Sequence, residues 1–317
     1  MMRGKLVAIS AAWLLGSVAL AGAARAACTT DPCAGGGSAS FDCDRDGLTD
    51  LEECGGLATA AGAAFAFPSC RVTPAAQPEC LDPTVSDLFV KFEKATPSSA
   101  YTELGITNAD AFSFITQAVS AGGLAVRVHI LDATQEGALL STPQPNSVTS
   151  RQPAVRVKEV RGASTACPIT APLGAVNGVT SVGGSSLAQI FTQRIIDHVG
   201  CVYGTANANS AAAIADKVKM IKHTTSHETT HLMRLAPESV DAYGGHHYRA
   251  GSGCVMDQAS TYTTKGGVKF ATPVKYCGPD QAAVSAGETA LGKIQCEDPS
   301  NTLDQDNFTN SCLPATP

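Results

Sequence analysis

His227-Glu228-Thr229-Thr230-His231 is the stretch of sequence that decides which fold this chain is expected to adopt. Residues four apart lie on the same face of an α-helix, so His227 and His231 can present their ring nitrogens to one ion. Glu228 then stands beside that ion, where a general base would take a proton from a water molecule whose pKa a bound zinc lowers to about 7. The stretch therefore predicts a helix that carries a hydrolytic zinc centre.

The residues that precede this stretch predict strands mixed with helices. Apolar or alternating runs indicate strands at 88–92, 124–131 and 154–160, and helical patterns cover 107–121, 186–199 and 210–235. Pro237 excludes a regular helix through its own position, so the helix with the two histidines should end at or before Ala236. This order predicts an α+β domain in which the active-site helix backs a mostly parallel sheet.

The third zinc ligand is expected in the segment that follows the helix. A catalytic zinc ion usually takes three protein ligands and leaves a fourth position for water. His246 and His247 lie in a glycine-rich stretch, and because neighbours in sequence usually point in different directions, only one of them should bind. His247 is favoured and His246 is the alternative. Asp241 and Glu288 are further candidates, so the third ligand stays open.

Three features together resemble the metzincin metallopeptidases. They are the pattern from His227 to His231, a histidine in the following loop, and Gly253-Cys254-Val255-Met256-Asp257, which is similar to the methionine turn of that family. The resemblance covers residues 227–257 and implies a zincin-like fold and a zinc-dependent endopeptidase. It implies zinc binding by His227, His231 and His247 (or His246), with Glu228 as general base and Met256 beneath the ion.

The chain departs from the usual metzincin pattern after the helix. Arg234 and Pro237 stand where the family usually has a glycine and its third histidine, which implies that the third ligand arrives from a longer loop. Asp241 is similar in setting to the aspartate ligand of deuterolysin-type peptidases, and Glu288 would correspond to the glutamate ligand of thermolysin-like enzymes.

A second metal site is predicted near the start of the chain, where residues 42–53 have the spacing of a twelve-residue calcium loop. Acidic side chains at positions 1, 3, 5, 9 and 12, a glycine at position 6 and a carbonyl at position 7 are the ligand pattern of such loops. The expected ligands are Asp42, Asp44, Asp46, Leu48, Asp50 and Glu53. The loop resembles those of EF-hand and thrombospondin type 3 modules, and Cys43 and Cys54 are expected to hold it by cross-links.

The first residues predict export. Arg3 and Lys5 precede an apolar run, and Ala24-Arg25-Ala26 fits a cleavage site, so residues 1–26 are interpreted as a signal peptide. Residues 27–85 then form a Cys-rich calcium-binding region, and residues 86–317 form the zinc metallopeptidase-like domain. All twelve cysteines follow the cleavage site, which favours disulfides in a secreted or periplasmic protein without a membrane span after cleavage.

The charge balance bears on the partner. Removal of Arg3, Lys5 and Arg25 with the signal peptide leaves 19 Lys and Arg against 28 Asp and Glu, a formal charge of −9. An acidic chain is a poor partner for nucleic acid or an anionic membrane, so a protein or peptide substrate is expected. The alternative function is a non-catalytic extracellular binding or surface protein that calcium and zinc only brace. A structural zinc site is closed by four ligands and needs no base, so Glu228 favours the enzyme.

Overall fold

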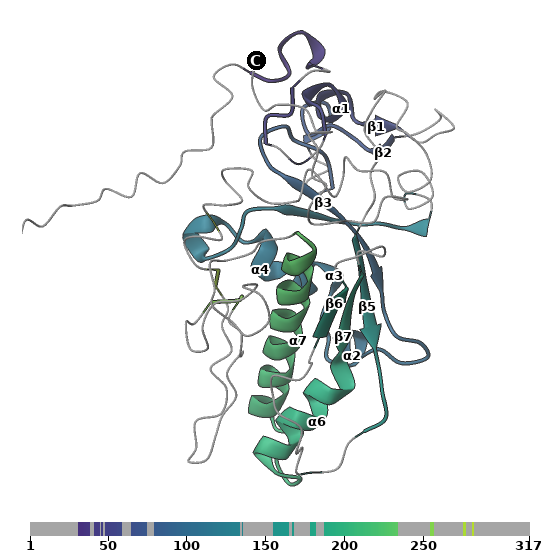
Figure 1. Cartoon of the computed structure of the whole chain (residues 1–317), viewed down its shortest axis with the longest axis vertical. Coiled ribbons are helices and arrows are strands. Elements are labelled where there is room, and N and C mark those ends of the chain that lie inside the picture. Colours follow the sequence, from purple (N-terminus) through teal and green to yellow (C-terminus); the bar gives the residue numbers. More distant parts are fainter. Residues whose placement is uncertain are drawn as a thin grey trace, which may run out of the picture.

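The computed structural model describes residues 31–38, 41–44, 46, 48–58, 65–74, 79–133, 135, 155–164, 167, 178–181, 187–233, 254–256, 275–276 and 281. The expected signal peptide, residues 1–26, lies outside them. The described residues form a five-stranded sheet, a two-stranded sheet and helices that cover the larger sheet (Figure 1). The α+β class expected from the sequence is therefore confirmed.

The larger sheet has the strand order β4-β3-β5-β7-β6. Its strands are β3 (Asp87–Glu93), β4 (Arg127–Ile130), β5 (Val155–Val160), β6 (Gly178–Ser181) and β7 (Leu187–Phe191). Strands β3, β4, β5 and β7 run parallel, whereas β6 pairs antiparallel with β7 and ends the sheet on that side within the described residues. The sheet is mostly parallel, as expected.

Strand β3 is buried on both of its faces. Leu88 and Val90 belong to the main core, whereas Phe89 between them belongs to a second apolar cluster on the opposite face. All three side chains are fully buried. Because successive strand residues point to opposite faces, a strand covered on both sides has a continuous apolar run instead of an alternating one. This explains the Leu-Phe-Val run of β3.

Residues 186–199 were expected to form one helix, and this prediction was wrong. The segment forms strand β7 followed by helix α6 (Thr192–Tyr203). Leu187, Ile190 and Phe191 fit the helical spacing i, i+3, i+4, but in the structure Ala188 and Ile190 are buried and their neighbours are half-buried, which is the period of a strand. Hydrogen bonding to β5 on one side and β6 on the other decides between the two patterns.

The helix expected at 107–121 is divided into three short pieces. They are α3 (Asn108–Ala111), α4 (Ser113–Thr116) and the 3₁₀ turn η3 (Val119–Ala121), and α2 (Ala100–Glu103) precedes them. Gln117 and Ala118 have extended backbone with ψ of 147° and 148°, so no helix continues through them. The strand that follows, expected at 124–131, is β4.

Helix α7 (Ala211–Leu232) is the longest described helix and carries the histidine pattern. Ser210 caps its start, where the Oγ accepts the backbone N–H of Ala213 at 3.3 Å. The helix ends before Pro237, as expected. It packs against β6 and β7 and beside α6 and α4 (Figure 1). The main core contains side chains from these helices and from the sheet. The sheet is therefore backed by the helix that holds the candidate zinc ligands.

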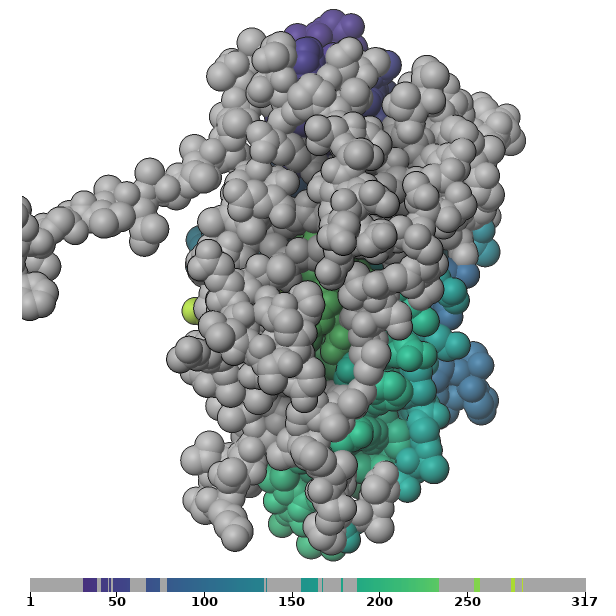
Figure 2. Space-filling view, viewed as in Figure 1, coloured from purple at the N-terminus to yellow at the C-terminus, as the bar shows by residue number. Residues whose placement is uncertain are grey.

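The described residues between 31 and 85, called the N-terminal region below, lie at one end of the molecule (Figures 1 and 2). They contain η1 (Ala34–Gly36), α1 (Asp50–Gly55), and β1 (Leu57–Ala58) paired antiparallel with β2 (Phe65–Phe67). A second apolar cluster joins this region to β3 and to the residue after β4. Its members are Leu48, Leu57, Phe67, Leu81, Phe89 and Leu131.

Disulfides cross-link both parts of the chain. Cys33–Cys54 and Cys70–Cys80 lie in the N-terminal region, and Cys167–Cys201 ties the segment after β5 to α6. Cys43 and Cys254 are disulfide-bonded as well, so Cys43 within the acidic loop and Cys54 directly after it are both cross-linked. Disulfides of this kind fit an oxidising compartment. Within the described part of the chain, no helix has the length and apolar character needed to cross a membrane.

Candidate metal centres

Three buried threonines of α7 form hydrogen bonds from their hydroxyl groups to the helix backbone. Thr225, Thr229 and Thr230 each donate from Oγ1 to the carbonyl four residues earlier, at 2.7 Å in every case. Threonine is a modest helix former, but these bonds allow its hydroxyl to be buried without a loss of hydrogen bonding. The helix can therefore be buried along the stretch that carries the two histidines.

The two motif histidines converge. The Nε2 atoms of His227 and His231 are 3.0 Å apart, and their rings are steeply tilted at 82° with centroids 4.7 Å apart. The Nδ1 of His227 lies 2.7 Å from the carbonyl oxygen of Val255. A carbonyl oxygen only accepts, so this Nδ1 carries the proton, and the Nε2 of neutral His227 turns a lone pair toward His231.

This geometry fits a shared metal ion. Two nitrogens held at about 2.05 Å by a tetrahedral zinc ion lie about 3.3 Å apart, close to the separation of the two Nε2 atoms here. Metal-bound histidines commonly donate their other N–H to a carbonyl or carboxylate, as His227 does to Val255. Without a cation, an Nε2–H···Nε2 hydrogen bond between the two rings accounts for the same distance.

The segment expected to resemble a methionine turn lies against the helix. Residues 254–256 are buried, and Met256 belongs to the main core. The Val255 N–H donates to the Lys275 carbonyl at 2.8 Å, which positions the Val255 carbonyl that His227 uses. Tyr276, the next residue, places its hydroxyl 2.6 Å from Thr230 Oγ1. The segment thus orients one candidate ligand through its backbone and supports the helix through Tyr276.

Glu228 is buried beside the edge of the sheet, with 8% of its surface exposed. Gly178, the first residue of β6, is the residue that lets it lie there. A Cβ atom at position 178 would come within 2.7 Å of the Glu228 Cδ and Oε1 atoms. Gly178 could not be predicted as a site residue, because a four-residue strand gives no period and nothing in the sequence relates it to α7.

The candidates for the third ligand cannot be placed. His246, His247, Asp241 and Glu288 all lie outside the described residues. The structure therefore brings together His227 and His231, with Glu228 next to them on the helix. The third zinc ligand stays a prediction.

The first three carboxylates of the acidic loop, residues 42–53, lie close together. Asp42, Asp44 and Asp46 each offer an oxygen within 4.8 Å of the other two. Asp42 Oδ1 accepts the Asp46 N–H at 3.2 Å, and Asp46 Oδ1 accepts the Leu48 N–H at 2.8 Å, so side chains of the loop also fold its backbone. This is the compact arrangement expected for positions 1, 3 and 5 of a calcium loop.

The second half of the loop starts helix α1. Thr49 caps the helix and forms a reciprocal capping box with Glu52. Asp50, expected at position 9, instead accepts the Cys43 N–H at 3.0 Å and is not part of either close carboxylate group. Glu53, expected at position 12, is fully buried and lies within 4.8 Å of Asp46 through their carboxylate oxygens.

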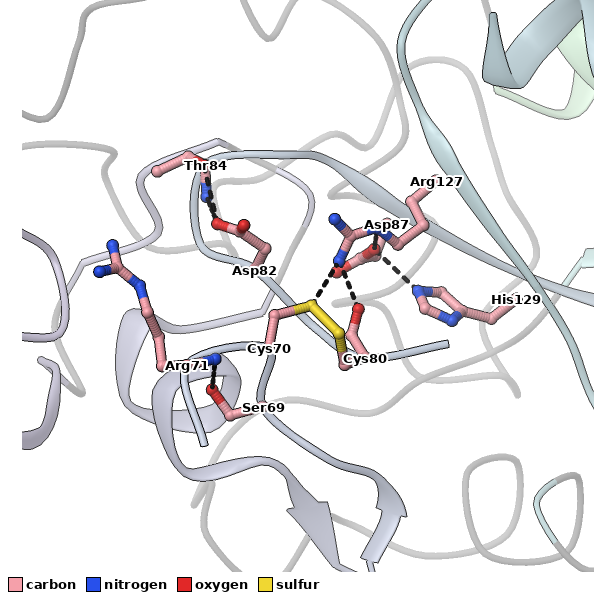
Figure 3. Close-up of a disulfide and its surroundings, with 9 residues drawn as sticks. All are labelled: Ser69, Cys70, Arg71, Cys80, Asp82, Thr84, Asp87, Arg127 and His129. Atoms are coloured by element: carbon pink, nitrogen blue, oxygen red, sulfur yellow. Dashed lines mark hydrogen bonds and ion pairs between the residues drawn. A yellow bond between two sulfur atoms is a disulfide. The ribbon is translucent and has the colours of Figure 1, made fainter. Parts of the chain in front are cut away.

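Asp87 is a neighbour of the loop that the sequence analysis missed. This first residue of β3 forms a buried group with Asp46 and Glu53, in which one oxygen of each lies within 4.8 Å of the others. Figure 3 shows its carboxyl group between the side chains of Arg127 and His129. Asp87 follows the predicted boundary at residue 85, and no spacing rule links it to the loop.

Burial and mutual repulsion raise the pKa values of this carboxylate group. Desolvation is the main cause for Asp46, Glu53 and Asp87, and the pKa values of Asp46 and Glu53 are well above their usual range. The charges of neighbouring carboxylates add to the effect in Asp46 and Glu53, whereas His129 and Arg127 oppose it in Asp87. A cation would reverse this balance by favouring the ionised forms.

Comparisons of this chain with protein-family models, with curated proteins and with solved structures found no match.

Proposed function

We propose that this chain is an exported zinc endopeptidase of metzincin type with a zincin-like fold. One observation carries the proposal: the Nε2 atoms of His227 and His231 converge to 3.0 Å while the Val255 carbonyl fixes the tautomer of His227. A neutral ring whose Nε2 lone pair is turned toward a second imidazole fits a pair of zinc ligands.

The surrounding architecture supports the same assignment. A mostly parallel sheet, an antiparallel strand at its edge and a long helix across it place the histidine pattern beside β6 and β7. The buried segment 254–256 lies where the resemblance to metzincins expects the methionine turn. The disulfides fit a secreted or periplasmic location.

His227 and His231 would hold the metal, and one of His247, His246 and Asp241 would complete the set. Zinc bound there supplies a Lewis acid and lowers the pKa of water at the site. Glu228 acts on the protons: it accepts one from the attacking water and delivers it to the leaving amine. Burial of Glu228 against Gly178 holds its carboxylate in place for both transfers.

The edge strand supports an extended peptide as substrate. Within the described residues β6 is an edge strand that hydrogen bonds only to β7, and a substrate backbone would pair with its other edge. An extended chain added to β6 would run past Gly178, whose lack of a side chain brings the backbone close to the Glu228 carboxylate. The general base would thereby face the peptide bond to be cleaved.

The test is the Glu228→Gln variant, with Glu103→Gln as a matched control. Glu103 lies on α2, where its half-exposed side chain pairs with Arg161 at 2.7 Å. We expect Glu228→Gln to keep one zinc per chain by elemental analysis, and to cleave unfolded protein about 10²- to 10⁴-fold more slowly. The control should match the wild type in both measurements.

Two results would count against the enzyme. Undiminished cleavage by Glu228→Gln would refute the role of Glu228 as general base. A wild-type protein that holds zinc through four protein ligands and cleaves nothing would support the alternative, in which the metals brace a non-catalytic binding or surface protein.

A further inference from the structure

Three buried carboxyl groups meet where the N-terminal region contacts the sheet. Asp46 comes from the loop, Glu53 from α1 and Asp87 from the start of β3, and each has no exposed surface. One oxygen of each lies within 4.8 Å of the other two. Asp46 also belongs to the loop's own group with Asp42 and Asp44, so the two groups are continuous.

The unpartnered carboxylate of Glu53 points to a bound ligand. Both of its carboxylate oxygens are buried and have no hydrogen-bond partner among the described residues. Burial of an unsatisfied carboxylate is costly, and native proteins rarely tolerate it without an ion or water. Its neighbours in the group are further carboxylates, so a cation satisfies Glu53 better than a hydrogen-bond donor would.

Asp87 is held in position for such a cation. Its Oδ1 lies 2.7 Å from His129 Nε2 and 4.0 Å from Arg127 Nε (Figure 3). Its backbone N–H donates to Asp46 Oδ2 at 2.6 Å. The Arg127 guanidinium also donates to the Cys80 carbonyl and to Cys70 Sγ. The side chain is therefore fixed from β4, with the loop directly beside it.

We propose that Asp87 is a ligand of the cation held by the 42–53 loop, so that one calcium ion fastens the N-terminal region to strand β3. The donors are all oxygens, which calcium prefers and which suit zinc poorly without nitrogen or sulfur. Ligands at about 2.4 Å from an ion can lie up to about 4.8 Å apart, and one oxygen of each residue in the two groups lies within that distance of the others.

This assignment changes what the loop does. A loop whose ligands all come from residues 42–53 would order only itself, whereas a ligand on β3 makes the ion part of the contact with the larger sheet. Ser86 strengthens the same contact, since its hydroxyl donates to the Asp44 carbonyl at 3.1 Å. The Phe89 ring stacks on His129 with centroids 5.0 Å apart, which packs the second apolar cluster beside the ion.

The experiment titrates calcium chloride into the full mature chain after removal of divalent ions, by calorimetry. The wild type is compared with Asp87→Asn and with Asp132→Asn, a matched control whose exposed side chain accepts the Gln135 N–H at 2.8 Å. We expect calcium affinity to fall at least tenfold in Asp87→Asn and to stay within twofold in the control.

A second measurement separates a ligand from a merely structural partner of His129. Calcium should raise the Tm of the wild type, and Asp87→Asn should lose most of that increase. A structural role alone would lower the Tm equally with and without calcium. If Asp87→Asn does not fold, Asp87→Glu keeps the charge and can still bond to His129, and its longer side chain should alter calcium affinity at least fivefold. Wild-type affinity in the folded variant, or no calcium binding by the wild type, overturns the proposal.

Discussion

Substitution of Gly178 by alanine tests whether the position of Glu228 matters for catalysis. Gly178 begins β6 and has no positive φ, so alanine can adopt its backbone conformation. The added Cβ would lie 2.4 Å from the Glu228 Cγ atom and 2.7 Å from its Cδ and Oε1 atoms, whereas ordinary contacts begin at 3.4 Å. The Glu228 side chain must therefore move by about 0.7 to 1 Å, because it is the flexible end of the pair.

The size of the effect follows from that displacement. A misplacement of about 1 Å can reduce catalysis about a hundredfold, so a shift of about 0.7 to 1 Å should reduce kcat/KM about ten- to a hundredfold. This range corresponds to about 1.4 to 2.7 kcal/mol of transition-state stabilisation. Zinc content should stay at the wild-type value, since Glu228 is not expected to bind the metal.

The assay measures kcat/KM on a fluorogenic peptide library together with zinc per chain. Gly162→Ala is the matched control, because a Cβ at position 162 meets nothing within 4 Å. Wild-type kcat/KM in Gly178→Ala would refute the placement of Glu228 as the base. Loss of zinc in that variant would contradict the separation of base and ligands.

Three further predictions follow from buried polar contacts. Glu159→Gln should lower the free energy of unfolding by about 2 kcal/mol in chemical denaturation. The carboxylate accepts the N–H groups of Ala95 and Ala100 and the Thr192 hydroxyl, whereas the NH₂ group of an amide cannot accept a hydrogen bond. An unchanged denaturation midpoint would contradict this. Tyr101→Phe should lower the free energy of unfolding by about 1 kcal/mol. The Thr225 hydroxyl donates to the Ile221 carbonyl, so it must accept the hydrogen bond from the Tyr101 hydroxyl that the variant lacks. A loss above about 3 kcal/mol would mean that the ring packing changes too. In the metal-free protein, the buried acidic group has raised pKa values, so the folded state binds protons more tightly and stability should fall as pH rises above the usual carboxyl range. The increase in Tm caused by calcium should therefore grow from pH 5 to pH 8, and an increase that shrinks would contradict the assignment.

The fold was predictable where one face of an element is buried. Residues 155–160 alternate because Val155 and Val157 point into the core, and the long helix follows from its spacing and from Pro237. Strand β7 was not predictable, since the spacing of Leu187, Ile190 and Phe191 fits both a helix and a strand, and only pairing with β5 and β6 decides. Partners distant in sequence supply that pairing.

The site was predictable where its residues are local in sequence. His227 and His231 lie one helical turn apart, and the loop carboxylates follow a fixed spacing, so both groups could be read from the chain. Gly178 and Asp87 could not, because each meets its site through the tertiary fold and neither belongs to a recognised pattern. A glycine that makes room and an aspartate that begins a strand are ordinary features of a sequence.

In the proposed enzyme, one zinc ion is shared by two histidines and keeps an open position beside Glu228. A crystal structure of the zinc-loaded chain, with anomalous data at the zinc edge, measures this directly. We expect one peak about 2.1 Å from the Nε2 atoms of both His227 and His231, with a third donor from the following loop and water in the remaining position. A peak elsewhere, or an ion enclosed by four protein ligands, would contradict the account.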